Sequence, residues 1–338
     1  MAKEIELKLR LQPEDIPALV SWLDNEATAT GQKTLNNDYF DTPELALAAA
    51  HSALRIRSTA SGYEQTFKAR SQSSNGVQVR HEWNWPLPER QLDPSLLALP
   101  EVQTCWPEPA ARDQLQTVFS TDFERRSWLY TAADGSEIEV VIDQGSILAN
   151  GQSEPLCELE LELVSGDDTA MWPLSGALHD VAPMWLSDIS KAERGYRLAG
   201  VGSASFHGAT IDAEGASLPE QAFDLQRALE YYLWCDGDLQ AIWQLGYPLA
   251  RLMNKEGALW QLLDKSLAMK SEHLLKDKAA AKALTRAVQQ VAGMCTESQP
   301  GRESIRDRWD EARSQVGDVI ECSETSSLSA SLKQLLKD

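Results

Sequence analysis

The chain has 338 residues, of which 43% are hydrophobic and 24% are charged, and these values exclude a fibrous or an intrinsically disordered architecture. Its 51 acidic and 31 basic residues leave a formal charge of −20, which argues against broad electrostatic binding to nucleic acid or to an anionic membrane. At about 100–200 residues per domain, this length predicts two domains.

The first 200 residues contain many short segments in which polar and apolar residues alternate, a pattern typical of β-strands. The predicted strands are Lys3 to Leu11, Leu54 to Ser58, Tyr63 to Arg70, Val77 to Trp85, Asp122 to Thr131, Glu137 to Asp143 and Leu156 to Val164. Helices are predicted at Pro13 to Asn25, Asp167 to Val181 and Lys191 to Leu198. Because most connections are too short for a crossover helix, the strands are expected to pair antiparallel.

The pattern changes after residue 200. Residues 201–217 are rich in Gly, Ala and Ser, the composition of a linker. From Leu218 onward, apolar residues recur three and four positions apart, which is the helical period. The sequence therefore predicts a helical bundle over residues 218–338, with the Trp and Met residues of this part in its core.

The cysteines and the N-terminus bear on the cellular compartment. None of the five cysteines forms a C-x-x-C pair, so reduced thiols are predicted rather than a disulfide framework or a zinc cluster. The N-terminus carries no apolar leader, and no segment reaches the length of a membrane span. We therefore expect a soluble, cytoplasmic protein with neither nucleic acid nor membrane as a partner.

Several predicted strands carry charged residues on one face and apolar residues on the other. In the first strand, Glu4, Glu6 and Lys8 alternate with isoleucine and leucine, and successive side chains of a strand point to opposite sides. A sheet with one face in water would produce the same alternation. However, residues 157–163 place three carboxylates two positions apart, and such like charges repel one another unless a cation lies between them.

This repulsion suggests a metal and an anionic ligand. Hard cations such as Mg²⁺ take oxygen ligands from one or two carboxylates, from water and from phosphate, and Glu4 and Glu6 with Glu160 and Glu162 could supply the carboxylates. Arginine and lysine suit phosphate recognition. The basic residues at matching strand positions are Lys8, Arg55, Arg57, Lys68, Arg80 and Arg125. Facing inward in an antiparallel barrel, this set would form a polar tunnel for a polyphosphate, with the apolar faces turned outward against helices.

In their order along the chain, these motifs resemble those of the CYTH superfamily, the triphosphate tunnel metalloenzymes. The chain opens with Glu4-Ile5-Glu6-Leu7-Lys8, the E-x-E-x-K form that begins this superfamily. The motifs that follow are Leu54-Arg55-Ile56-Arg57, Thr66-Phe67-Lys68, Arg80-His81-Glu82, Phe123-Glu124-Arg125-Arg126, Ile142-Asp143-Gln144-Gly145, Glu158-Leu159-Glu160-Leu161-Glu162 and Ser190 to Tyr196. They are most similar to the motifs of the bacterial inorganic triphosphatases, in which a helical CHAD domain follows the CYTH domain.

The resemblance implies an α+β fold with a closed antiparallel eight-stranded β-tunnel over residues 1–200. The linker at 201–217 and a helical domain over 218–338 would follow. Residues 203–338 contain two histidines and more acidic than basic residues, so this helical domain is expected to be a diverged or truncated CHAD-like domain. The binding partner of this helical domain stays open.

The implied reaction is the Mg²⁺-dependent hydrolysis of inorganic tripolyphosphate to pyrophosphate and phosphate, with Mn²⁺ as an alternative metal. The resemblance assigns metal binding to Glu4, Glu6, Glu158, Glu160 and Glu162. It assigns substrate binding to Lys8, Arg55, Arg57, Lys68, Arg80, Arg125 and Lys191. It assigns catalysis to Glu6, Lys8, Glu82 and Asp143, and leaves the base open between a metal-activated water, Lys8 and a tunnel carboxylate.

Other readings stay open at this point. The same acidic and basic residues serve thiamine triphosphatases, nucleoside triphosphatases and class IV adenylate cyclases of the superfamily. A non-catalytic polyphosphate-binding protein is a further alternative, although anion binding alone would not need so many acids. Family members often carry a second basic residue two positions after the first, where this chain has Ser127. Either a bulge turns Arg126 inward or one phosphate contact is missing.

Overall fold

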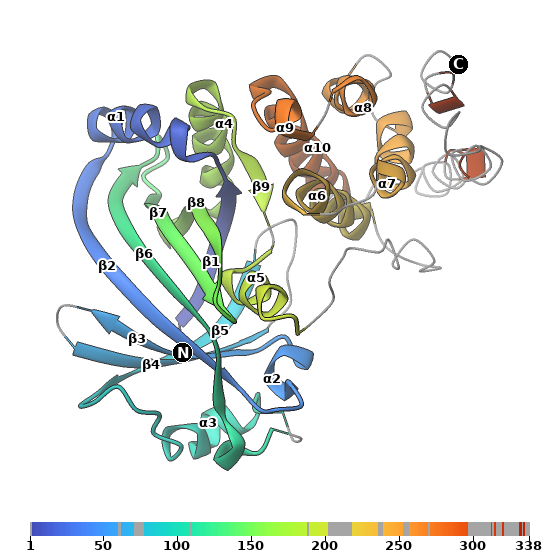
Figure 1. The fold of residues 1–338 in the computed structure, drawn as a ribbon. Helices are drawn as coiled ribbons and strands as arrows, with labels where there is room; N and C mark the ends of the chain where they lie inside the picture. The colour runs from blue at the N-terminus through green and yellow to red at the C-terminus, as the bar shows by residue number, and fades with distance from the viewer. Residues whose placement is uncertain are drawn as a thin grey trace. The chain divides into compact units, whose positions relative to one another are not determined.

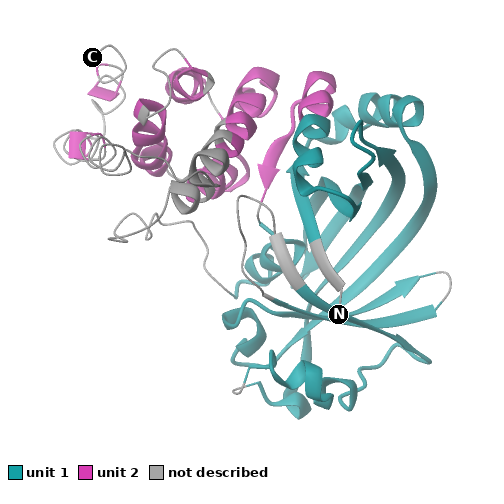
Figure 2. Ribbon diagram, turned by 180° about the vertical axis from the view of Figure 1, so that it is seen from behind, with its two compact units in different colours: residues 1–175, 189–204 teal, residues 176–188, 205–338 magenta. Residues whose placement is uncertain are grey.

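The structure is a computed structural model. It describes residues 2–59, 62–70, 78–107, 110–187, 189–201, 218–235, 239–252, 257–269 and 271–296, together with isolated positions after residue 296. The chain divides into two compact units, residues 1–175 with 189–204 and residues 176–188 with 205–338 (Figure 2). The predicted linker at 201–217 lies almost wholly outside the described residues, and the domain limits expected from sequence stay predictions.

The first unit is an antiparallel β-structure (Figure 1). Its strands are β1 (Ala2–Arg10), β2 (Thr28–Asp41), β3 (Ala53–Thr59), β4 (Gly62–Arg70), β5 (Gln78–Leu87), β6 (Gln116–Thr131), β7 (Glu137–Ala149) and β8 (Gln152–Ser165). Neighbours follow the order β5-β4-β3-β2-β6-β7-β8-β1. Strand β1 also pairs with β5, residues 2–6 against 78–82, so the series of pairings returns to its first strand. The α+β class and the antiparallel pairing are confirmed.

Short helices connect and cover these strands. They are η1 (Pro13–Asp15), α1 (Ile16–Glu26), α2 (Ala46–Ala49), η2 (Leu96–Ala98), α3 (Pro100–Gln103), η3 (Arg112–Gln114), η4 (Asp168–Ala170), α4 (Met171–Val181) and α5 (Lys191–Leu198). Helix α1 starts with a proline in its first turn and buries Ile16, Leu19 and Leu23, as the spacing predicts. The three helices expected from sequence in this part are confirmed.

Strand β2 is the element that the alternation pattern does not reveal. Its first seven residues are exposed, and only its second half alternates between buried and partly buried positions. Two of the four buried residues there, Asn37 and Asp41, are polar. A search for hydrophobic periodicity therefore finds no strand, because half of the buried residues of β2 are polar.

The outward face of β3, β4 and β5 is apolar and covered. Leu54, Phe67 and Trp83 pack with Leu97 and Val102 from η2 and α3. Because strand side chains alternate, the charged residues next to these positions point to the opposite side, into the unit. The expected arrangement, with charges inside and apolar faces against helices, is present here.

Helix α5 packs on an aromatic cluster inside the first unit. Tyr39 of β2 stacks on Phe119 of β6 with ring centroids 4.4 Å apart, and Phe119 meets Tyr196 of α5 edge to face at 5.2 Å. Gly195 allows this approach, because a Cβ atom at that position would lie 2.1 Å from the Phe119 ring. The cluster holds α5, whose first residue is Lys191, against the strands.

The second unit contains β9 (Trp185–Ser187) and the helices α6 (Leu218–Trp234), α7 (Leu239–Leu252), α8 (Ala258–Ala268), α9 (Ser271–Leu274) and α10 (Lys278–Thr296). The segment 176–188 is tied to these helices: the Trp185 indole donates to the Leu275 carbonyl at 3.1 Å, and Ser187 donates to the buried Glu230 at 2.7 Å. The predicted helical character of this part is confirmed. Among the described residues, no helix has the length and apolar character needed to span a membrane.

Candidate functional site

A polar cavity of about 320 Å³ lies inside the first unit. Each of the strands β1 to β6 contributes side chains to it, as do β8 and the first turn of α5. The charged residues that line it are Glu6, Lys8, Arg55, Arg57, Lys68, Glu82, Arg125, Glu160, Glu162 and Lys191. Basic residues outnumber acidic ones by six to four in this described lining.

Strand register explains why the opposite charges meet. Lys8 of β1 lies directly opposite Glu160 of β8, and Arg125 of β6 lies opposite Asp143 of β7. Side chains of directly opposed residues stand on the same face of a sheet within contact distance. The ion pairs of the cavity are thus fixed by backbone pairing.

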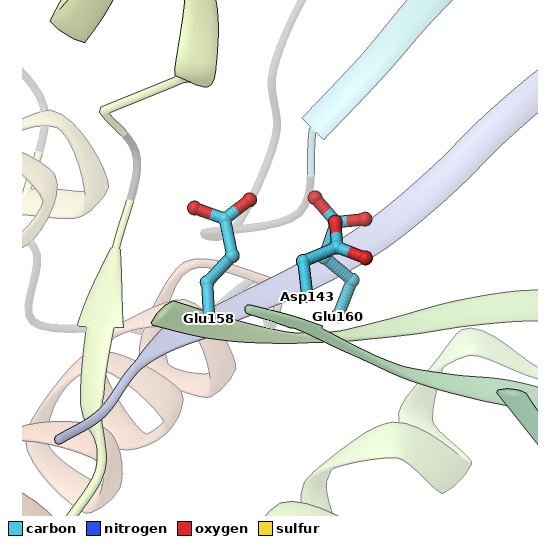
Figure 3. Close-up of side chains that lie close together, drawn as sticks. All are labelled: Asp143, Glu158 and Glu160. Carbon is cyan, nitrogen blue, oxygen red and sulfur yellow. The ribbon is translucent and has the colours of Figure 1, made fainter. Parts of the chain in front are cut away.

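One side of the cavity, which we call the acidic wall, consists of Asp143, Glu158 and Glu160 with the cations Lys8, Arg125 and Lys191. Figure 3 shows the three carboxylates on neighbouring strands, with those of Asp143 and Glu160 side by side. Lys191 Nζ contacts Glu158, lies 2.8 Å from Asp143 Oδ2 and lies 3.0 Å from Glu160 Oε1. All three carboxylates therefore share one ammonium group.

Lys8 and Arg125 complete this wall. Lys8 Nζ donates to Glu160 Oε1 at 2.7 Å. Arg125 donates to both oxygens of Asp143 at 2.7 Å and to Glu160 Oε2 at 2.7 Å. Such bidentate pairing fixes the guanidinium plane. Each buried carboxylate of the acidic wall is consequently matched by at least one cation.

The pKa values follow these contacts. Burial alone would lower the pKa of Lys8, but the carboxylates of Glu160, Glu6 and Glu158 outweigh it, and the pKa is raised well above its usual value. Burial would raise the pKa of Glu160, but Lys191, Lys8 and Arg125 hold it well below its usual range. Lys8 and Glu160 therefore both stay charged near neutral pH.

The opposite side, which we call the basic wall, consists of Arg55, Arg57 and Lys68 with the single carboxylate Glu82. Lys68 Nζ lies 2.7 Å from Glu82 Oε2, its direct cross-strand partner, and Arg55 Nη2 lies 4.0 Å from Glu82 Oε1. Burial would raise the pKa of Glu82, but Lys68 and Arg55 lower it to about 2. One carboxylate thus serves several cations here.

Arg57 is the cation of the basic wall with the least compensation. Its Nε donates to the neutral amide oxygen of Asn37 at 2.8 Å. Burial lowers the pKa of Arg57, and the nearby cations Arg55 and Arg125 lower it further, to about 9. The lowered pKa shows that Tyr39 and Glu64 compensate the buried charge of Arg57 only in part, and an anion would complete that compensation.

A second charged network lies behind the acidic wall. The Glu154 carboxylate accepts from Arg194 at 2.8 Å and from Arg197 at 2.6 Å, and Arg10 lies 3.4 Å away. Arg194 is 1% exposed, and its Nη1 lies 3.6 Å from Glu158 Oε2. Lys191 and Arg194, one turn apart on α5, therefore each lie beside one oxygen of Glu158.

The donor set of the site suits a hard metal ion. Asp143, Glu158 and Glu160 each offer a carboxylate oxygen, all within 4.8 Å of one another, and such oxygen donors bind Mg²⁺ or Mn²⁺. Lys191 already contacts all three. Glu6 and Glu162 lie directly opposite each other on β1 and β8 and both line the cavity beside Glu160. These acids offer a further oxygen set that faces the cavity.

The structure brings most of the site residues predicted from sequence to one cavity. Asp143 and Glu158 stand behind its surface, fully buried under Arg125 and Lys191. The side chains of Glu4 and Arg80 lie outside the described ones. Sequence reasoning missed Tyr39, which lines the cavity and whose aromatic character is the usual signature of a core position.

Arg126 points away from the cavity. The β6–β7 register runs without a shift from Ser120 to Thr131, so no bulge turns Arg126 inward. It lines a separate hollow of about 600 Å³ beside α1 and pairs with Glu124 at 3.1 Å. Ser127 is buried and shares the inward side with Arg125. The second basic position of the motif is therefore not replaced by Arg126.

Comparisons with known proteins match the first unit to a known family. A family model described as CYTH domain matches residues 2–196. The chain is 34% identical over 200 residues to a Haemophilus influenzae protein named inorganic triphosphatase. That match covers 59% of this chain and 55% of the relative, so the chain spans about half the length of the curated relative it matches.

Solved structures are more distant. A Hippeastrum protein, provisionally assigned as an adenylyl cyclase and described as having a dominant triphosphatase activity, is 23% identical, with a TM-score of 0.43 over 59% of this chain and 97% of that one. A provisionally assigned adenylate cyclase of Bacillus halodurans is 18% identical, with a TM-score of 0.37 over 54% and 91% of the two chains. At these TM-scores, neither structure carries an argument.

Proposed function

Because this chain belongs to the CYTH family, we propose that it hydrolyses inorganic tripolyphosphate to pyrophosphate and phosphate in the cavity, with Mg²⁺ as the metal and Mn²⁺ as the alternative. The observation that carries the proposal is the convergence of six cationic side chains from separate elements on one buried cavity that also holds four carboxylates. The relative named inorganic triphosphatase supports the choice of substrate.

The charge balance supports a metal together with an anionic substrate. The described lining carries two more positive than negative charges. A triphosphate would overcompensate this excess, and a divalent cation bound with it would restore neutrality in a buried place, where unbalanced charge is costly. A site for a simple anion would need the basic residues without Glu6 and Glu162.

The metal would be held by Glu6, Glu160 and Glu162, with Glu4 added from sequence. When bound, such an ion neutralises charge on the phosphate oxygens and lowers the pKa of a bound water. Glu158 stands apart from this set, because it is buried behind the cavity surface and Lys191 contacts it there, whereas Glu6, Glu160 and Glu162 line the cavity. We therefore assign Glu158 to the positioning of α5.

The remaining residues hold and orient the phosphates. Arg55, Arg57 and Lys68 would bind the phosphate oxygens from the basic wall, while Lys8, Arg125 and Lys191 would approach them from the acidic wall. Because its pKa is raised, Lys8 stays protonated and acts as a cation rather than as a base. Asp143 touches Arg125 and Lys191 and stands behind the cavity surface, so its role is to orient these cations.

Organic triphosphates and cyclase chemistry remain the alternatives within the family. The described cavity lining contains Tyr39 and the methyl groups of Ala53 and Ala192 as its apolar surface. A nucleobase or a thiamine ring needs a larger apolar or aromatic platform. This favours an inorganic substrate. The non-catalytic polyphosphate-binding alternative predicts binding that is indifferent to metal.

The test is phosphate release from tripolyphosphate, ATP and thiamine triphosphate, each assayed with Mg²⁺, with Mn²⁺ and with EDTA. The proposal expects rapid, EDTA-sensitive release from tripolyphosphate and much slower release from the two organic substrates. Faster release from an organic triphosphate would move the substrate assignment. Metal-independent binding without release from any of the three would favour the non-catalytic alternative.

A further inference from the structure

Two arginines of the cavity are held by cross-strand partners of different charge. Arg125 of β6 lies directly opposite Asp143 of β7 and donates to both oxygens of that carboxylate. Arg57 of β3 lies directly opposite Asn37 of β2, and its Nε donates to the Asn37 Oδ1 atom at 2.8 Å. The two pairs share the same register relation, and asparagine and aspartate have nearly the same shape. The difference between the pairs is therefore one of charge.

The orientation of the Asn37 amide follows from its two partners. A guanidinium group has donors only, so the amide atom that faces Arg57 must be the oxygen. The Asn37 Nδ2 atom then donates to the Thr121 Oγ1 atom of β6 at 2.9 Å. Thr121 lies directly opposite Asn37, and both residues are 1% exposed. A row of three residues across β3, β2 and β6 thus fixes the Arg57 guanidinium through neutral groups.

The electrostatics of the two arginines differ in the same way. The carboxylates that surround Arg125 outweigh burial and raise its pKa well above the usual value. Burial and the nearby cations lower the pKa of Arg57 to about 9, because Tyr39 and Glu64 oppose them only in part. Arg57 also lines the cavity. The Asn37 amide therefore holds this guanidinium without cancelling its charge, and the charge is available to an anion in the cavity.

We propose that Asn37 is a positioning residue for substrate binding, which orients the Arg57 guanidinium in the cavity and, because it is neutral, leaves the charge of Arg57 to a phosphate group. The hydrogen bond to Asn37 uses Nε, so the two terminal amino groups of Arg57 can donate to the oxygens of the substrate. The inference rests on the proposed function, since tripolyphosphate is the anion that Arg57 would bind. It gives a role to a buried residue outside the described cavity lining.

The substitution Asn37→Asp changes the charge of this residue and keeps its shape. Aspartate retains an acceptor oxygen for Arg57 Nε, and its second oxygen can accept from the Thr121 hydroxyl. We expect the Kd for tripolyphosphate, measured by calorimetry, to rise about tenfold, because the new carboxylate competes with the anion for the charge of Arg57. The urea midpoint of the ligand-free protein should rise, because a buried cation gains a partner.

The matched control is Asn36→Asp. It adds the same charge one residue earlier on β2, where the side chain points to the other side of the strand. Asn36 lies opposite Ser58 and Asp122 and is partly exposed. We expect this control to change the Kd for tripolyphosphate by less than about twofold, because water and salt screen a charge outside the cavity. The comparison separates an effect on Arg57 from an effect of net charge.

Affinity and stability together decide the outcome. A purely structural asparagine would tolerate aspartate in its place, so a wild-type Kd for Asn37→Asp overturns the inference. An equal loss of affinity in Asn36→Asp, or weaker binding by Asn37→Asp with a lower urea midpoint, overturns it as well. If the wild-type protein neither binds nor hydrolyses tripolyphosphate, the proposed function fails instead, and the urea midpoints then decide on Asn37. A higher midpoint for Asn37→Asp supports the uncompensated charge of Arg57, and an equal or lower midpoint overturns it.

Discussion

The acidic and basic walls of the cavity use the same kinds of side chain to opposite effect. In the acidic wall, three cations match three carboxylates, with contacts to Asp143 and Glu160 at 2.7–3.0 Å, and its charge is balanced without a ligand. In the basic wall, Glu82 faces Lys68 and Arg55, whereas Arg57 is crowded by Arg55 and Arg125 and has Glu64 as its compensating carboxylate. The first wall is complete when the chain folds, whereas the second becomes balanced only when an anion binds. One wall should therefore respond to mutation in stability and the other in affinity.

The largest effect is expected from breaking the acidic wall. Lys191→Met would leave Asp143, Glu158 and Glu160 without their shared ammonium group, and removing one partner of a buried ion pair costs about 3–5 kcal/mol. The urea midpoint of the first unit should drop accordingly. The matched change Lys68→Met in the basic wall frees one half-buried carboxylate and should cost about 1 kcal/mol or less. Equal losses in both variants would remove the distinction between the walls.

Two substitutions distinguish a carboxylate that binds the metal from one that stabilises the fold. Glu162→Gln should raise the Mg²⁺ concentration needed for half-maximal activity by roughly tenfold or more, as loss of a metal-site group does, with little change in unfolding. Glu158→Gln should lower stability by about 2–3 kcal/mol through its lost contacts with Lys191 and Arg194 and leave the Mg²⁺ requirement as it was. The reverse pattern would make Glu158 the metal ligand and Glu162 the structural acid.

Arg57→Gln tests whether the basic wall serves anion binding. Removing a cation that is crowded by Arg55 and Arg125 should leave the unfolding free energy of the ligand-free protein within about 0.5 kcal/mol of wild type or raise it. The same change should raise the Kd for tripolyphosphate about tenfold, measured by calorimetry. Arg126→Gln is the control, because Arg126 lies on the outer hollow. A weakening of binding by Arg126→Gln equal to that by Arg57→Gln would contradict the placement.

Lowering the pH should produce the smallest and most gradual change in stability. The pKa of Glu82 is lowered from 4.5 to about 2, so the folded protein binds fewer protons than the unfolded chain in that range. The stability from Glu82 is complete above pH 4.5 and is lost as the pH falls towards about 2. Urea midpoints measured across this range should decline less steeply for Glu82→Gln. Parallel declines would show that Glu82 does not contribute.

The sequence predicts the site better than it predicts the strands that build it. Alternation identifies β1 and β8, so the pattern alone is enough to place Glu6, Lys8, Glu160 and Glu162 on the charged faces of their strands. It fails for β2, because Asn37 is buried for its hydrogen bonds to Arg57 and Thr121, not for hydrophobic burial. Tyr39 is lost with this strand, since one sequence cannot show that a residue of the core cluster also lines the cavity.

The alternation pattern also does not predict how deeply each inward residue is buried. Asp143, Glu158 and Glu160 occupy equivalent inward positions in the alternation, yet Glu160 lines the cavity and the other two stand behind it. The difference comes from α5, which inserts Lys191 between them. A contact between residues more than thirty positions apart depends on tertiary packing, and periodicity carries no information about it.

The grouping of residues 176–188 with the second unit limits how recombination can exchange parts of this chain. The polypeptide passes between the two units three times, at about residues 175, 188 and 204. A single recombination point cannot exchange one unit for another, because any one break leaves a piece of at least one unit attached to the wrong side. A break at residue 204, for example, would part Trp185 and Ser187 from Leu275 and Glu230. The two units are therefore expected to be inherited together, as a pair that has adapted jointly.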